Sequence, residues 1–161
     1  MDSEGYANAC DKQLPRAVKV MDPFHVVHLA LDKLTKTRQR VQQETTGHRG
    51  RKGDLLYRGR RPLLTRVPLL SAKQLTVLEE LFADERHQSV EITWSVTQKI
   101  MAAYSQRDRK RGKQMMAEVI DSIASGVPKG LDELRVLGRT MNKRRDDILA
   151  YFDYEICKRP R

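Results

Sequence analysis

The sequence predicts a mainly α-helical fold with one or two β-strands near its N-terminus. Over most of the 161 residues, apolar side chains recur at the three- and four-residue spacing of amphipathic helices. Ala17–Met21 differs, because it is a continuous and partly β-branched apolar run that stops at the turn dipeptide Asp22-Pro23. That pattern is typical of a short buried strand. With 39% hydrophobic and 32% charged residues, the chain can form one core under a heavily charged surface.

A long amphipathic helix is expected directly after this strand. Pro23 suits the first helical position, where its missing N–H costs nothing, and Asp22 is placed to cap the helix. A carboxylate at the end of a strand either caps the helix or belongs to a functional site, and the sequence leaves both open. The apolar face of this helix consists of Phe24, Val27, Leu31, Leu34 and Val41.

Basic residues crowd the chain beyond this helix. The formal net charge is +10 and the isoelectric point is about 9.9, which favours a polyanionic partner, although a solvated basic face is the alternative. Glycines make Thr45–Gly53 a loop, and a basic helix is expected around Asp54–Leu64. Arginine and lysine on such a segment can contact the phosphates of DNA. The candidate DNA-binding residues are Arg49, Arg51, Lys52, Arg58, Arg60 and Arg61.

Further helices follow in the second half of the chain. Ser71 and Gln74 form a capping box before an apolar stripe of Leu75, Leu78 and Phe82. The next stripe contains Trp94, which is either a core anchor or a platform for an unpaired base. Two more helices are expected, one with apolar residues from Met115 to Ile123 and a last one over Leu131–Phe152.

Several classes of protein receive no support. Cys10 and Cys157 are isolated, so neither a zinc cluster nor a disulfide framework is indicated. No apolar run approaches the roughly 20 residues of a membrane span, and the N-terminus lacks the pattern of a signal peptide. We therefore expect a cytoplasmic location and no membrane partner.

One stretch carries a family resemblance. The string Val20-Met21-Asp22-Pro23-Phe24-His25-Val26-Val27 resembles the DxFH segment of bacterial insertion-sequence transposases of the ISL type. Asp22 and His25 fit the C/D-x-x-H signature of related lineages. The resemblance implies a DDE transposase with an RNase H-like core, and a function in DNA transposition.

The resemblance also implies an internal division of the chain. Residues 1–41 would be the remnant of the RNase H-like core, with a strand at 17–22 and the helix after it. Residues 42–152 would be a basic helical insertion region, and residues 153–161 a tail. The expected fold is therefore a helical insertion region attached to one or two strands of an incomplete RNase H-like sheet.

Catalysis in the intact family implies two Mg²⁺ ions held by three carboxylates. Asp2 would correspond to the second catalytic Asp, with a flexible acidic N-terminus as the alternative. No residue matches the first Asp or the Glu, so we expect no complete metal site in this chain. The resulting hypothesis is a truncated transposase that binds DNA, is inactive alone, and has intact transposase or itself as a further partner. The alternatives are a non-catalytic DNA-binding protein and a helical interaction module.

Overall fold

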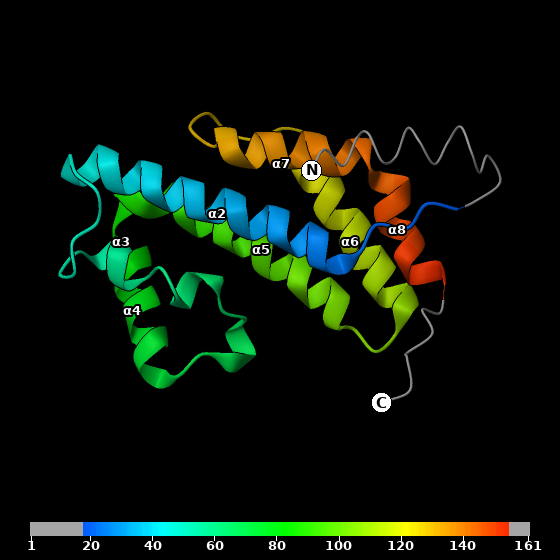
Figure 1. Cartoon of the computed structure of the whole chain (residues 1–161), viewed down its shortest axis with the longest axis horizontal. Coiled ribbons are helices and arrows are strands. Elements are labelled where there is room, and N and C mark those ends of the chain that lie inside the picture. Colours follow the sequence, from blue (N-terminus) through cyan, green and yellow to red (C-terminus); the bar gives the residue numbers. More distant parts are fainter. Residues whose placement is uncertain (1–17, 155–161) are drawn as a thin grey trace.

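The computed structural model describes residues 18–154, and this part is built from helices joined by short connections (Figure 1). The α-helices are α2 (Pro23–Thr46), α3 (Leu55–Arg58), α4 (Ala72–Phe82), α5 (Gln88–Ser105), α6 (Arg109–Ala124), α7 (Asp132–Lys143) and α8 (Arg145–Asp153). Short 3-10 helices cover Pro62–Leu64, Val67–Leu69 and Glu85–His87. Residues 18–154 contain no strand, so the mainly α fold is confirmed.

The strand expected over residues 17–22 is not found in the part that the structure describes. Val18–Asp22 has no regular secondary structure, because a strand needs a neighbour for its hydrogen bonds and none exists within residues 18–154. The amide of Met21 instead donates to the carbonyl of Asp147 in α8, at 3.0 Å, and the Met21 side chain is buried. The apolar run therefore anchors the chain to α8 before α2 begins.

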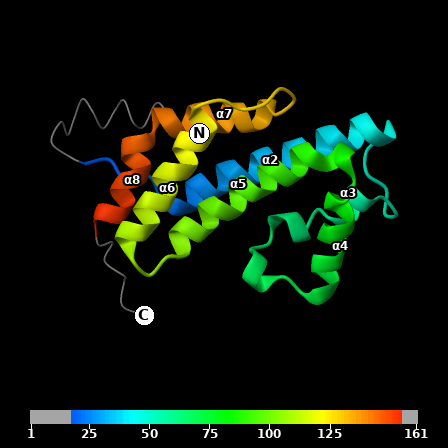
Figure 2. The same cartoon turned by 180° about the vertical axis from the view of Figure 1, so that it is seen from behind.

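Helices α2 and α5 lie side by side and antiparallel along the length of the molecule, as Figures 1 and 2 show from opposite sides. α2 begins as predicted, with Pro23 in its first turn and the Asp22 carboxylate accepting a hydrogen bond from the Phe24 amide at 2.8 Å. It ends at Gly47, whose φ of 72° is in the left-handed region that favours glycine. α2 passes without a break through the boundary expected at residues 41 and 42.

The core has two parts along this helix pair. α6, α7 and α8 cover one half of the pair, and α3 and α4 cover the other half (Figure 2). The first part of the core includes Val26, Ala30, Ile100, Met116, Ile120, Leu137 and Ile148. The second includes Leu34, Val41, Leu56, Leu63, Leu78, Leu81 and Val90. Because α2 and α5 contribute to both parts, they hold the loop that follows α2 in a fixed position relative to the rest of the fold.

The last expected helix is divided in two. We predicted a single helix over Leu131–Phe152, whereas Arg144, with φ −105° and ψ 19°, separates α7 from α8. Asp146 and Asp147 lie in the first turn of α8, where carboxylates interact favourably with the helix dipole. The change of direction lets α8 pack against α6 and bury Phe152.

The capping box of α4 is confirmed. The Ser71 hydroxyl accepts a hydrogen bond from the Gln74 amide at 3.3 Å, and the Gln74 side-chain oxygen accepts one from the Ser71 amide at 3.0 Å. The expected apolar stripe is only partly right, because Leu75 is 40% exposed while Leu81 is fully buried. No helix within residues 18–154 is long and apolar enough to cross a membrane.

Candidate nucleic-acid interface

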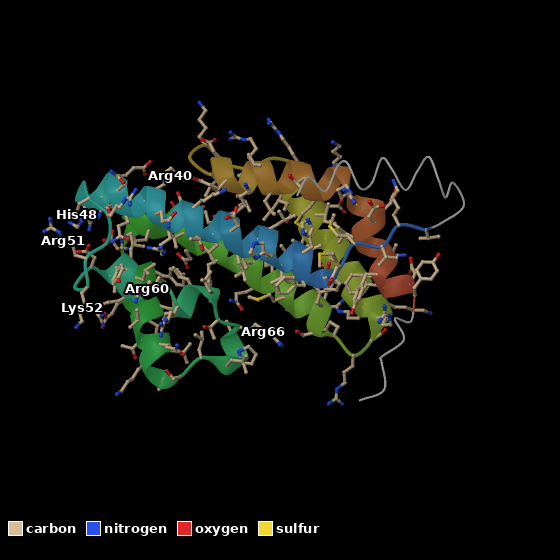
Figure 3. All side chains as sticks on the ribbon, viewed as in Figure 1. Arg40, His48, Arg51, Lys52, Arg60 and Arg66 are labelled. Carbon is tan, nitrogen blue, oxygen red and sulfur yellow. The ribbon has the colours of Figure 1, made fainter. Side chains whose placement is uncertain are left out.

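The loop between α2 and α3 projects basic side chains from one end of the molecule. Arg49, Arg51 and Lys52 are exposed, and no carboxylate within residues 18–154 forms an ion pair with any of them. Figure 3 shows Arg51 and Lys52 at the end of the helix pair that is farthest from α8. This loop, residues 47–54, is called the basic loop below.

The basic loop is anchored rather than free, which the sequence did not indicate. The Asp54 carboxylate accepts hydrogen bonds from the Arg51 amide at 2.7 Å and from the Gln42 side-chain nitrogen at 3.2 Å. Gln42 is only 2% exposed, and its side-chain oxygen accepts a hydrogen bond from Arg38 at 3.1 Å. Asp54 and Gln42 therefore fix the course of the loop that carries the three cations.

The remaining candidate DNA-binding residues, Arg58, Arg60 and Arg61, follow the loop in the sequence, and their environments differ. Arg61 is exposed and forms no ion pair in the described part of the chain. Arg58 is also exposed, with the Glu80 carboxylate 3.8 Å away. Arg60 is half-buried, since its guanidinium lies 3.9 Å from the centre of the Tyr57 ring and donates to the Tyr57 carbonyl. Arg49, Arg51, Lys52 and Arg61 are thus exposed cations without carboxylate partners in the described part of the chain, and we call these four the cation set.

Arg40 is basic but has a structural role. Its guanidinium donates to both oxygens of Glu133, at 2.7 and 3.1 Å, and to the Gly130 carbonyl at 2.8 Å. The hydrogen bonds to Glu133 raise the pKa of Arg40 above its ordinary value. Burial raises the pKa of Glu133, but the hydrogen bond from Arg40, the positive charge of Arg40 and the further hydrogen bonds to this carboxylate together outweigh burial. The pKa of Glu133 is therefore below its ordinary value. Arg40 therefore ties α2 to the start of α7.

The basic cluster at Arg107–Arg111 is also partly structural. Arg109 donates to the carbonyls of Tyr151, Phe152 and Tyr154, so it satisfies the C-terminal end of α8. Its guanidinium also lies 4.9 Å from the centre of the Tyr151 ring. Part of the positive charge counted in the sequence therefore stabilises the fold.

Asp22 and His25 lie at the start of α2, where Asp22 acts as the helix cap. No group of three or more His, Cys, Asp or Glu side chains within residues 18–154 could hold a metal ion. The described residues therefore do not fit the magnesium pair that the resemblance implies. Asp2 lies outside the described residues. Its assignment as a catalytic residue, and that of Asp22 and His25 as family motif residues, stay predictions.

Trp94 is part of the core beneath α4. Its ring packs against Phe82, with the ring centres 5.0 Å apart, and it contacts the second part of the core. Its ring nitrogen is buried and has no hydrogen-bond partner among the described residues. This environment agrees with a core anchor, and we give Trp94 no part in the interface.

Comparison with known proteins gives a family but no individual relative. Residues 1–158 match the family of transposases of the ISL3 type. No curated protein and no solved structure matches the chain significantly. The family match covers nearly the whole sequence and agrees with the resemblance around Asp22 and His25. The chain belongs to the DDE transposase family of the ISL3 type.

Proposed function

We propose that this chain binds duplex DNA during transposition, and that the cation set provides the main contact. The observation that carries this proposal is the exposure of Arg49, Arg51, Lys52 and Arg61 without carboxylate partners in the described residues, with Arg51 and Lys52 at one end of the molecule (Figure 3). The transposase family supplies the polyanionic partner that such a surface favours.

The basic loop is suited to the phosphate backbone. Each phosphate neutralised by a cation releases counterions from DNA, so affinity depends on salt and little on base sequence. The hydrogen bonds of Asp54 order the loop before DNA arrives, and less conformational entropy is then lost on binding. Backbone contacts of this kind position a protein on DNA without reading its sequence.

We further propose that the helices of residues 18–154 do not themselves cleave DNA, and that this chain is inactive alone. DDE chemistry needs three converging carboxylates, and the family resemblance matches only Asp2 to one of them. Within residues 18–154, Asp22 is engaged as a helix cap and no acidic group fits a metal pair. The carboxylates for cleavage would then come from outside residues 18–154.

We also propose intact transposase, or a second copy of this chain, as a partner at the start of α2. Val20 and Phe24 are 40% and 78% exposed there, and exposed apolar side chains favour association. Phe24→Ser should weaken self-association in analytical ultracentrifugation. A wild-type chain that stays monomeric when mixed with intact transposase would contradict this proposal.

The DNA-binding proposal is tested by the salt dependence of affinity. Fluorescence anisotropy with a short duplex should give a linear plot of log K against log salt between about 50 and 200 mM. Changing the cation set to Ala should reduce the slope by up to about 3.6, since each phosphate contact contributes about 0.9. Arg139→Ala is the matched control, because Arg139 is exposed on α7 away from the loop.

Two results would count against the proposal. The first is a cation-set variant whose plot of log K against log salt has the same slope as that of the wild-type chain. This result would place the DNA contact on another surface. The second is nicking of the duplex in Mg²⁺ or Mn²⁺ by the isolated chain, which would show that it holds a complete active site. Loss of that activity in Asp2→Ala would assign the site to the resembled Asp.

A further inference from the structure

A cavity of about 520 Å³ lies between the C-terminal half of α2, the basic loop and α3. Its lining includes Arg38, Gln42, Arg49, Gly50 and Tyr57. Arg38 and Gln42 project from α2, Arg49 and Gly50 come from the loop, and Tyr57 comes from α3. The cavity therefore shares Arg49 and the basic loop with the cation set, and its other walls come from α2 and α3.

The charge of the cavity is positive. Arg38 is half-buried and forms no ion pair with a carboxylate in the described part of the chain. Burial and the nearby charge of Arg60 both lower the pKa of Arg38. Arg49 contributes a second guanidinium to the lining. Among the described residues, the lining contains no carboxylate, and the Asp54 carboxylate at the α3 end of the loop is already bonded to Gln42 and to the Arg51 amide.

The walls of the cavity are held in place. The buried side chain of Gln42 accepts from Arg38 at 3.1 Å and donates to Asp54 at 3.2 Å, which fixes Arg38 relative to the loop. A Cβ atom on Gly50 would lie 2.6 Å from the Gln42 side-chain nitrogen and 2.7 Å from the Tyr57 ring. Only glycine fits at this close approach of the loop to α2 and α3.

These features select an anion rather than a stacked base. The guanidinium of Arg60 covers one face of Tyr57, and Gly50 abuts the edge of that ring. The ring is thus a wall of the cavity and not a free platform. Guanidinium groups bind phosphate oxygens through paired and charge-assisted hydrogen bonds.

We propose that this cavity is a phosphate-binding site in which Arg38 and Arg49 together hold one phosphate group. The proposal deepens the proposed DNA binding if the phosphate belongs to a bound duplex. A free phosphate ion would satisfy the same two guanidinium groups, so the test must separate the two sources.

The test uses the full chain with its arginine side-chain N–H groups observed by nuclear magnetic resonance. One titration adds inorganic phosphate, and a second adds a short duplex. We expect both ligands to shift the Nε–H signals of Arg38 and Arg49, while the Arg139 signal stays in place. Arg49→Gln should weaken phosphate binding about tenfold, since one charged hydrogen-bonding group is lost.

Arg49→Gln is the preferred variant, because the Arg49 side chain is exposed and no hydrogen bond of that side chain is seen among the described residues. Its melting temperature should therefore equal that of the wild-type chain. Arg38→Gln is the second variant, and it should abolish the phosphate-induced shift of Arg49.

The outcomes separate the two proposals. If phosphate shifts both signals but the duplex does not bind, the cavity is a site for free phosphate and the proposed function fails. If the duplex binds and shifts the two signals, the phosphate is that of DNA. If neither ligand shifts Arg38 more than Arg139, the cavity proposal is overturned, even when the duplex binds through the cation set.

Discussion

Replacing Arg40 by Gln should lower the stability of the protein and leave its affinity for DNA nearly unchanged. The variant removes a guanidinium that binds both oxygens of Glu133 and the Gly130 carbonyl. It also leaves the Glu133 carboxylate without its charged partner, although that side chain is only 16% exposed. The cost should therefore exceed that of an ordinary surface ion pair.

The magnitude follows from the exposure of the two side chains. Exposed ion pairs contribute about 0–1 kcal/mol, and breaking a buried pair costs about 3–5 kcal/mol. Arg40 is 31% exposed, so the pair lies between these limits and nearer the first. We expect a loss of about 1–2 kcal/mol, which lowers the melting temperature by roughly 2–8 °C in a domain of this size.

Circular dichroism melting and urea unfolding would measure this loss, with Arg139→Gln as the control of equal charge change. A double-mutant cycle with Glu133→Gln would isolate the coupling between the two side chains. An Arg40→Gln variant that melts with the wild-type chain would refute the structural role of Arg40. A fall in the salt slope like that of the cation-set variant would place Arg40 in the DNA interface.

The other predictions concern stability. The pKa of Glu133 lies below its ordinary value, so the stabilisation from its pair with Arg40 should be complete above the ordinary pKa of a glutamate and disappear as the pH falls through the folded pKa. The free energies of urea unfolding of wild type and Glu133→Gln should therefore converge in acid. Asp22→Ala removes the cap of α2 and should cost about 0.5–2 kcal/mol in urea unfolding without changing anisotropy with DNA; an unchanged midpoint would contradict the capping role. Gly138→Ala places a Cβ 2.6 Å from the Ile123 carbonyl oxygen, so α6 and α7 must separate. We expect the free energy of urea unfolding to fall by about 1–3 kcal/mol. An unchanged free energy of unfolding would mean that the two helices can move apart freely.

Local features of the fold could be predicted from the sequence. The caps at Asp22 and Ser71 depend on residues only two or three positions away, so the pattern alone locates the start of α2 and of α4. The glycines after Thr46 likewise indicate the basic loop. The break at Arg144 carries no glycine or proline, and it depends on how α8 packs against α6.

Features that depend on distant partners could not be predicted. Met21 belongs to an apolar run typical of a strand, but the run becomes a strand only if another strand lies beside it. The positive charge of Arg40 is visible in the sequence, while Glu133, 93 residues later, is not an obvious partner. The role of Gln42 in anchoring the basic loop is hidden for the same reason, since a glutamine on an amphipathic helix is usually exposed.

Chemical modification of lysines tests the proposed DNA contact most directly. Lys52 belongs to the cation set, whereas Lys99 and Lys129 are exposed on α5 and on the connection between α6 and α7. Acetylation of each lysine would be followed by mass spectrometry, with and without a saturating short duplex. We expect DNA to slow the modification of Lys52 and to leave Lys99 and Lys129 unchanged. Equal modification of Lys52 with and without DNA, together with protection of Lys99 or Lys129, would contradict the account.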